Sequence, residues 1–116
     1  MSPKGPYTLV TVNKVPERAK LLIGRVVDDV KDRYTITHAA NVDSIDGVKA
    51  TVEQVRPNLL FTASMWTPEE AQEIVAIAKS VIPDLKTFSL PQGLQVQRGS
   101  DGVVEYIKEN LPALLD

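Results

Sequence analysis

The sequence contains no cysteine and only one histidine, His38. The absence of cysteine excludes disulfide bonds, thiolate nucleophiles and thiolate metal ligands, and it is typical of cytoplasmic proteins. A lone histidine without cysteine also argues against a zinc site. We therefore expect a cytoplasmic protein with no metal site, and no motif in the chain indicates a resident cofactor.

Basic charge is not in excess, and long hydrophobic runs are missing. The chain carries 13 Lys and Arg against 15 Asp and Glu, which gives a formal net charge of -2. Nucleic-acid binding needs concentrated positive charge, and a membrane-spanning helix needs roughly 20 consecutive apolar residues. The sequence has neither feature, so we expect no nucleic-acid partner and no membrane association.

Four short apolar runs alternate with four amphipathic stretches along the 116 residues. The runs are rich in β-branched residues, which favour strands, whereas the stretches between them repeat apolar residues every three or four positions, as helices do. We expect one α/β domain, residues 1–116. The predicted strands are 7–12, 34–40, 58–64 and 86–90, and the predicted helices begin near Pro16, at Asp43 or Ser44, at Pro68 and at Ser100.

The clearest local signal is the start of the third helix. Thr67 can act as the N-cap, Pro68 suits the first helical position, and Glu70 stands three residues after the threonine. This spacing predicts a capping box, in which the threonine hydroxyl and the glutamate carboxylate each accept a backbone N–H.

Regular alternation of strands and helices predicts a mostly parallel sheet with helices on both faces. The simplest arrangement is an open, doubly wound, three-layer sheet with the strand order 2-1-3-4. It resembles a flavodoxin-like, Rossmann-like or receiver-like fold shortened by one strand, and the resemblance covers architecture alone.

Ligands of doubly wound sheets bind beyond the carboxyl ends of the strands, where the strand order reverses. For the order 2-1-3-4 this point lies between the first and third strands, and the loop after the fourth strand lies at its margin. The predicted ligand-binding residues are those in the three loops: Asn13, Lys14, Ser64, Met65, Trp66, Gln92 and Gly93.

The first of these loops excludes several familiar uses of such a crevice. Phosphate-binding loops need glycine after the strand, and the stretch Thr11 to Arg18 contains none. A receiver domain needs acidic residues after the first strand and a phospho-accepting aspartate after the third. Asn13 and Ser64 occupy those places, so we predict that metal-assisted phosphorylation does not occur here.

Two residues are weak candidates for catalysis. His38 is expected at the end of the second strand, where it could transfer protons near neutral pH or could simply be hydrogen-bonded by backbone groups. Ser64 follows a strand and precedes a helix, as nucleophilic serines of hydrolases do, but the flanking glycines of that turn are missing. Trp66 and Met65 likewise fit either a shield over the core or a recognition surface.

The last loop suggests a second kind of interface. Leu94 and Val96 alternate with Gln95 and Gln97, a two-residue rhythm that predicts a short extended piece. The edge of the fourth strand would be open, so this piece could fold back on its own domain, form a lid at the rim of the crevice, or contribute to a homodimer. Of these we favour a homodimer through that edge and through Leu94 and Val96.

Taken together, the residues favour a non-catalytic module of unknown function that binds a small molecule or another protein. The alternative is a small enzyme that uses His38 or Ser64 at the carboxyl-end crevice. The sequence does not identify a substrate for such an enzyme.

Overall fold

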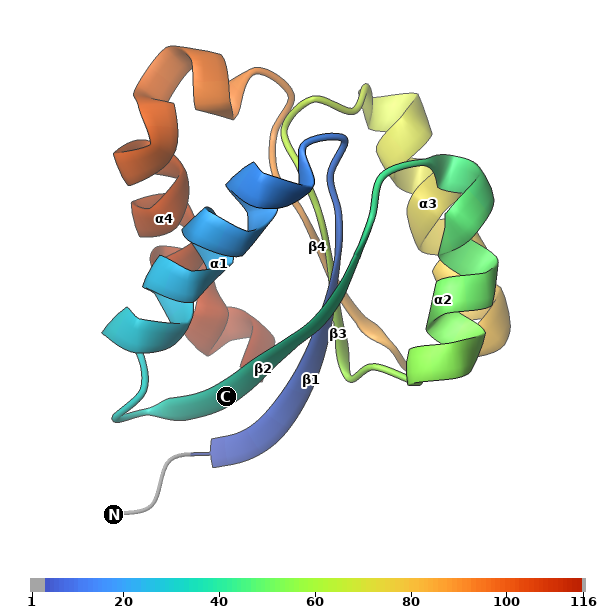
Figure 1. Cartoon of the computed structure of the whole chain (residues 1–116), viewed down its shortest axis with the longest axis horizontal. Coiled ribbons are helices and arrows are strands. Elements are labelled where there is room, and N and C mark those ends of the chain that lie inside the picture. The colour runs from blue at the N-terminus through green and yellow to red at the C-terminus, as the bar shows by residue number, and fades with distance from the viewer. Residues whose placement is uncertain (1–3, 116) are drawn as a thin grey trace.

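The computed structural model describes residues 4–115 and contains one four-stranded sheet flanked by helices (Figure 1). Among these residues, no helix is both long enough and apolar enough to cross a membrane. The elements follow in the order β1 (Lys4–Val12), α1 (Pro16–Asp29), β2 (Tyr34–Val42), the 3₁₀ turn η1 (Ile45–Gly47), α2 (Val48–Val55), β3 (Leu59–Thr62), α3 (Pro68–Val81), β4 (Lys86–Ser89) and α4 (Leu94–Leu115).

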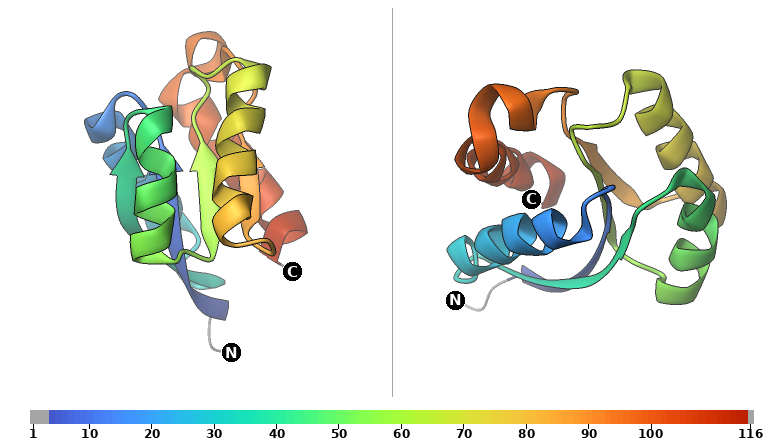
Figure 2. Two further views of the ribbon diagram at one scale, coloured as in Figure 1. Left: turned by 90° about the vertical axis from the view of Figure 1, so that its right-hand side faces the viewer. Right: turned by 45° about the horizontal axis from the view of Figure 1, so that its top comes forward.

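All three pairs of neighbouring strands are parallel, and the strand order is β2-β1-β3-β4. Val10 at the centre pairs with Ala40 on one side and with Leu60 on the other. Helices α1 and α4 cover one face of the sheet and α2 and α3 cover the other (Figures 1 and 2). The predicted shortened flavodoxin-like fold is therefore confirmed.

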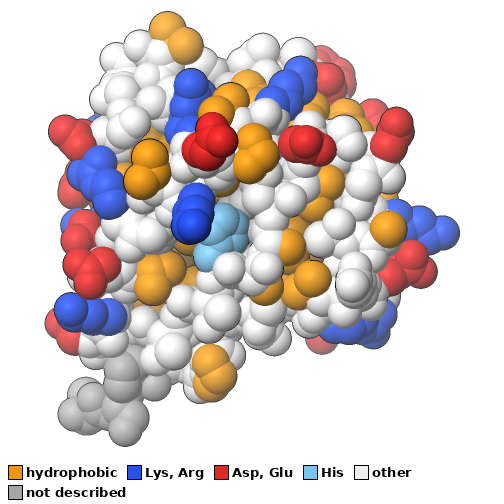
Figure 3. All heavy atoms as spheres, viewed as in Figure 1, with side chains coloured by type: hydrophobic (Ala, Val, Ile, Leu, Met, Phe, Trp, Pro, Cys, Tyr) orange, Lys and Arg blue, Asp and Glu red, His pale blue; other side chains and the backbone are white. Residues whose placement is uncertain are grey.

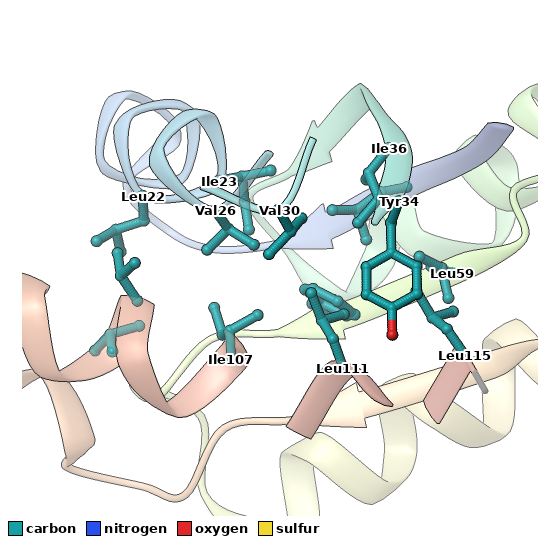
Figure 4. Close-up of a cluster of buried hydrophobic side chains, with 14 of the residues drawn as sticks. Leu22, Ile23, Val26, Val30, Tyr34, Ile36, Leu59, Ile107, Leu111 and Leu115 are labelled. Carbon is teal, nitrogen blue, oxygen red and sulfur yellow. The ribbon is translucent and has the colours of Figure 1, made fainter. Parts of the chain in front are cut away.

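The two faces of the sheet carry separate hydrophobic cores because successive strand residues point to opposite faces. Leu9, Leu59 and Phe61 pack toward α1 and α4, whereas Val10 and Leu60 pack toward α2 and α3. Figure 4 shows the first of these cores, with Leu59 among its labelled residues. Both central strands are thus buried on both sides, which explains why their sequences lack a clean polar–apolar alternation.

The capping box at the start of α3 forms as predicted. The Thr67 hydroxyl accepts the Glu70 backbone N–H at 3.1 Å, and the Glu70 carboxylate accepts the Thr67 N–H at 3.0 Å. These bonds hold the pKa of Glu70 below its usual value, the backbone bond from Thr67 being the main cause. The N-terminus of α3 is therefore closed by its own side chains.

The prediction of an extended piece at Leu94 and Val96 is wrong, because α4 already begins at Leu94. Leu94 is buried in the α1–α4 core, and Val96 is 91% exposed. Gly99, with φ of 67°, breaks α4 near the predicted start at Ser100. Four alternating residues are too few to distinguish a strand from one turn of helix, and tertiary contacts decide the outcome.

Candidate functional site

The loops after β1 and β3 meet at the carboxyl edge of the sheet, as predicted. The Lys14 backbone N–H lies 3.1 Å from the Met65 sulfur, and the Lys14 ammonium lies 4.9 Å from the centre of the Trp66 ring. A cation at this distance from an indole face is attracted to it. The sequence-based placement of the two loops side by side is therefore right.

The only tryptophan is a structural wedge between these loops. Its Nε1–H donates to the Val12 carbonyl at 2.8 Å, and only 3% of Trp66 is exposed. The ring packs into the α2–α3 core with Ile74 and Val48 among its members. Trp66 thus covers the edge of the core, and the Lys14 ammonium lies over its ring.

Ser64 ties the loop after β3 to the start of α4. Its carbonyl accepts the Gly93 N–H at 2.9 Å, and its hydroxyl accepts the Gln95 N–H at 3.2 Å. Ser64 is only 7% exposed. Its oxygen is held by a backbone donor, and no base within residues 4–115 is bonded to it, so this hydroxyl is placed as a structural anchor.

A polar network lies on the α1 side of β1 and β2. The Asn41 amide nitrogen donates to the Asn13 carbonyl at 3.0 Å, so the amide oxygen must accept the Thr11 hydroxyl, at 2.7 Å. The Thr11 oxygen then accepts the Nε2–H of His38 at 2.8 Å. This chain of bonds sets both the rotation of the hydroxyl and the tautomer of the imidazole.

A β-bulge makes the network possible. The register between β1 and β2 shifts by one residue between the pairs Leu9–His38 and Val10–Ala40. In a regular strand His38 and Asn41 would point to opposite faces, since they are three residues apart. The extra residue, Ala39, places both on the face of Thr11.

His38 lies in the middle of β2, and the expectation that it ends the strand is wrong because β2 continues to Val42. Burial lowers its pKa, partly offset by a hydrogen bond with the Ala40 backbone. Within residues 4–115 no carboxylate is bonded or ion-paired to its ring. A general base needs a group that orients it and stabilises its charge, and here the ring is bonded to a hydroxyl instead.

The point where the strand order reverses is nearly filled. A hollow of about 30 Å³ remains there, bounded by Thr11, Asn13, Phe61 and the inner sides of α1 and α4. That volume holds a water molecule or two but no metabolite. No group of three or more potential metal-ligating side chains occurs in the described part of the chain.

A much larger groove lies one strand farther on, between α3 and the loop after β4. We call it the Trp66 groove; it measures about 440 Å³ and its lining is mainly apolar. It is formed by Trp66, Pro68, Ala71, Gln72, Val75, Ala76, Ser89, Leu90, Pro91 and Gln92. This is the size range of ligand pockets in proteins.

The structure brings the predicted residues together but leaves few of them accessible. Lys14 and Gln92 are exposed, Met65 and Gly93 are partly buried, and the other three, Asn13, Ser64 and Trp66, are buried.

Sequence reasoning missed the contribution of α3 to the groove. Ala71, Gln72, Val75 and Ala76 form a stripe beside the fully buried Ile74 and Ala78. The spacing of three and four residues predicts a helix, but it does not show whether another element covers these positions.

Comparison with known proteins adds the fold and little else. No protein family and no curated protein sequence matches the chain. Among solved structures it is similar to the isolated REC domain of RcsB from Salmonella enterica serovar Typhimurium, determined in the presence of the phosphomimetic BeF3-. The match has a TM-score of 0.57 and 8% identity, and it covers 87% of this chain and 72% of the other. The likeness is one of fold.

Proposed function

We propose that the chain is a non-catalytic module that binds an apolar segment of another protein in the Trp66 groove. The observation that carries the proposal is the groove itself, about 440 Å³ of mainly apolar surface bounded by a helix and a loop. Pockets of this kind are the usual places for ligands, and exposed apolar surface with a polar margin is typical of interaction sites.

The rim supports a protein partner over a small polar metabolite. Gln72 and Gln92 lie along the groove and are exposed. Interface cores are enriched in aromatic residues and methionine, with polar groups around them. The groove presents two amides beside a mainly apolar lining, and such a surface suits a leucine-like or aromatic anchor.

The competing enzyme hypothesis has less support. The Ser64 hydroxyl is bonded to the Gln95 backbone, and the His38 ring is bonded to Thr11. An acyl-transfer or acid–base site needs the nucleophile and base joined to one another and facing a pocket. The hollow beside Thr11 has about 30 Å³, which leaves no room for a substrate.

A matched pair of variants tests the proposal. Ala76→Arg places a long side chain in the groove, and Ala50→Arg makes the same change on α2, where the alanine is also exposed and lies outside the groove. The wild-type protein and both variants are immobilised, incubated with extract of the native host, and compared by quantitative mass spectrometry.

We expect one or a few proteins to be retained by the wild type and by Ala50→Arg, and to fall at least about tenfold with Ala76→Arg, since an anchor in a pocket carries about 1.4 kcal/mol or more. Equal retention by Ala76→Arg would refute the groove as the site. A small molecule found by native mass spectrometry on gently purified protein, lost with Ala76→Arg, would replace the protein partner with a metabolite.

A further inference from the structure

Strand β4 is an open edge of the sheet, and it lies beside the Trp66 groove. The strand order places it outermost, next to β3 alone. Its last residue, Ser89, is exposed and lines the groove together with α3. Figure 3 shows the molecule from the side of the other edge, β2, with the only histidine near the middle, so the β4 edge lies at the back of that view. An open edge strand is a template for pairing with another strand.

The backbone of β4 turns hydrogen-bonding groups outward at two residues. The Leu90 N–H donates to the Thr62 carbonyl of β3 at 3.0 Å, so the even-numbered residues of this segment face β3. Because backbone groups alternate along a strand, the N–H and C=O of Thr87 and Ser89 face away from it. Neither backbone has a hydrogen-bond partner among residues 4–115. Pro91, which follows, has no N–H and ends the free edge.

The side chains of these two residues point to the face that α3 covers. Thr87 pairs with Leu60, which belongs to the α2–α3 core, and Ser89 follows two residues later on the same face. A strand added beside β4 would place its own alternate side chains on that face. The side chain beside Ser89 would enter the Trp66 groove, and the side chain two residues along would lie beside Thr87.

A lysine on α3 stands in line with the groove. Lys79 is exposed and follows the groove residue Val75 by four positions, so the two share one side of the helix. Among residues 4–115 Lys79 has no ion pair. Asp84 and Lys86, near the start of β4, are both exposed and opposite in charge, so Lys79 sets the net charge at this end.

The lysine and the edge strand have matching spacings. Helix α3 runs antiparallel to the strands, since it connects the parallel strands β3 and β4. Four positions along a helix, about 6 Å, match two residues along a strand, about 6.6 Å. The side chain beside Thr87 would therefore lie close to Lys79, and a carboxylate at that place would be complementary in charge.

From these features we infer that the partner segment binds as an added strand. It pairs with the β4 backbone at Thr87 and Ser89, places a leucine-like or aromatic side chain in the Trp66 groove, and places a carboxylate two residues away beside Lys79. Addition of a strand to a sheet edge, with alternate side chains entering pockets, is an established mode of peptide recognition. The inference rests on the proposed function and specifies the conformation and the charge of the partner.

Two synthetic peptides test the inference on the full chain. Both are blocked heptapeptides of serine and threonine in which a leucine and a glutamate stand two residues apart. The order of the two residues is reversed in the second peptide, because one order fits a parallel strand and the other an antiparallel strand. In an NMR titration of isotope-labelled protein, we expect at least one peptide to bind with a dissociation constant below about 1 mM, the weak binding of a small interface. The amide protons of Thr87 and Ser89 should shift downfield as they become hydrogen-bonded.

Protein variants separate the backbone and charge contributions. Ser89→Pro removes an outward N–H, a substitution that edge strands tolerate, and should weaken binding at least tenfold. Ser89→Ala keeps the N–H, so it should weaken binding less than about threefold. Lys79→Glu should weaken binding about threefold or more, whereas Lys49→Glu, on the exposed side of α2, should leave it unchanged. Far-UV circular dichroism and urea unfolding check that each variant is folded.

A second measurement leaves the protein unaltered. The peptide nitrogens that face β4 alternate with those that face solvent, so methylating the first set should abolish binding and methylating the second set should not. Equal binding of the two methylated peptides would overturn the added strand, and so would the failure of both original peptides to bind.

The groove and the edge are tested separately. Binding that Ala76→Arg weakens tenfold, and that Ser89→Pro and Ser89→Ala leave equal, would overturn the added strand while the groove stays the site. Binding that neither Ala76→Arg nor Ser89→Pro weakens would refute both proposals. Self-association of the protein that Ser89→Pro abolishes would also overturn the inference, because a second copy would then occupy the edge.

Discussion

Replacing Trp66 should lower the free energy of unfolding. The size of the loss depends on the hydrogen bond of the indole and on its packing in the core. The Nε1–H bond goes to the Val12 carbonyl, which also accepts the Ala63 N–H at 3.0 Å. In Trp66→Phe the carbonyl keeps that second donor, so the lost bond should cost about 1 kcal/mol rather than the larger penalty of an unpaired buried group. The smaller ring adds a packing loss, and we expect about 2 kcal/mol in all.

Trp66→Ala leaves a far larger void in the α2–α3 core, since only 3% of the tryptophan is exposed. Truncations of this kind cost about 3–5 kcal/mol. Urea unfolding followed by far-UV circular dichroism measures both variants, because the tryptophan fluorescence is lost with the residue. In a chain of this size 1 kcal/mol corresponds to roughly 4 °C in the melting temperature.

Two results together would refute this reasoning: a Trp66→Phe variant whose free energy of unfolding is within about 0.5 kcal/mol of the wild type, and a Trp66→Ala variant that loses less than about 1.5 kcal/mol. Losses this small are those of an exposed position. That pair of results would mean that the ring contributes surface rather than core. Leu21→Ala is the control, since Leu21 is 71% exposed and should change stability by less than about 0.5 kcal/mol.

Three further predictions concern α3, β2 and α4. Thr67→Ala removes the hydroxyl of the capping box and should lower the free energy of unfolding by about 1 kcal/mol in the same urea assay, whereas no change would mean that the box is not formed in solution. Burial lowers the pKa of His38 in the folded protein, so the unfolded chain binds more protons near pH 6. The contribution of His38 to stability should therefore be fully present above pH 6.5, and the free energy of unfolding should fall as the pH drops below that value. Replacing His38 with Gln should flatten that part of the stability–pH curve, and an NMR titration of the ring that gives an ordinary or raised pKa would contradict the assignment. Ile107→Ala, at a position 2% exposed between α4 and the sheet, should cost about 2–5 kcal/mol, and a smaller loss would show that α4 packs loosely.

Periodicity was enough to predict the sheet order and its layers. A chain in which apolar strands alternate with amphipathic helices has few possible sheet topologies, because each helix must connect two parallel strands and cover one face of the sheet. The capping box at Thr67 was equally readable, because its chemistry is local. The adjacency of Lys14 and Met65 followed from topology alone, since the ends of parallel neighbours share one edge.

The parts that could not be predicted depend on long-range contacts. Leu94 belongs to a helix because Ser64, some 30 positions earlier, binds the backbone of that turn and the core accepts its side chain. Trp66 could line a crevice or close it, and only the position of the Val12 carbonyl decides between the two. Binding by the seven predicted residues, the cytoplasmic location and the homodimer through β4 remain predictions.

The inserted residue at Ala39 also has a bearing on how related chains should be compared with this one. It reverses the parity of every later position in β2, so that even-numbered side chains face α1 before it and α2 after it. In a relative lacking that one residue, the counterparts of His38 and Asn41 would stand two positions apart, so a regular strand without a bulge would still turn both toward the threonine. Deleting Ala39 should thus remove the bulge and leave the histidine cluster on one face, whereas deleting a residue elsewhere between His38 and Val42 would also change a residue that pairs with β1.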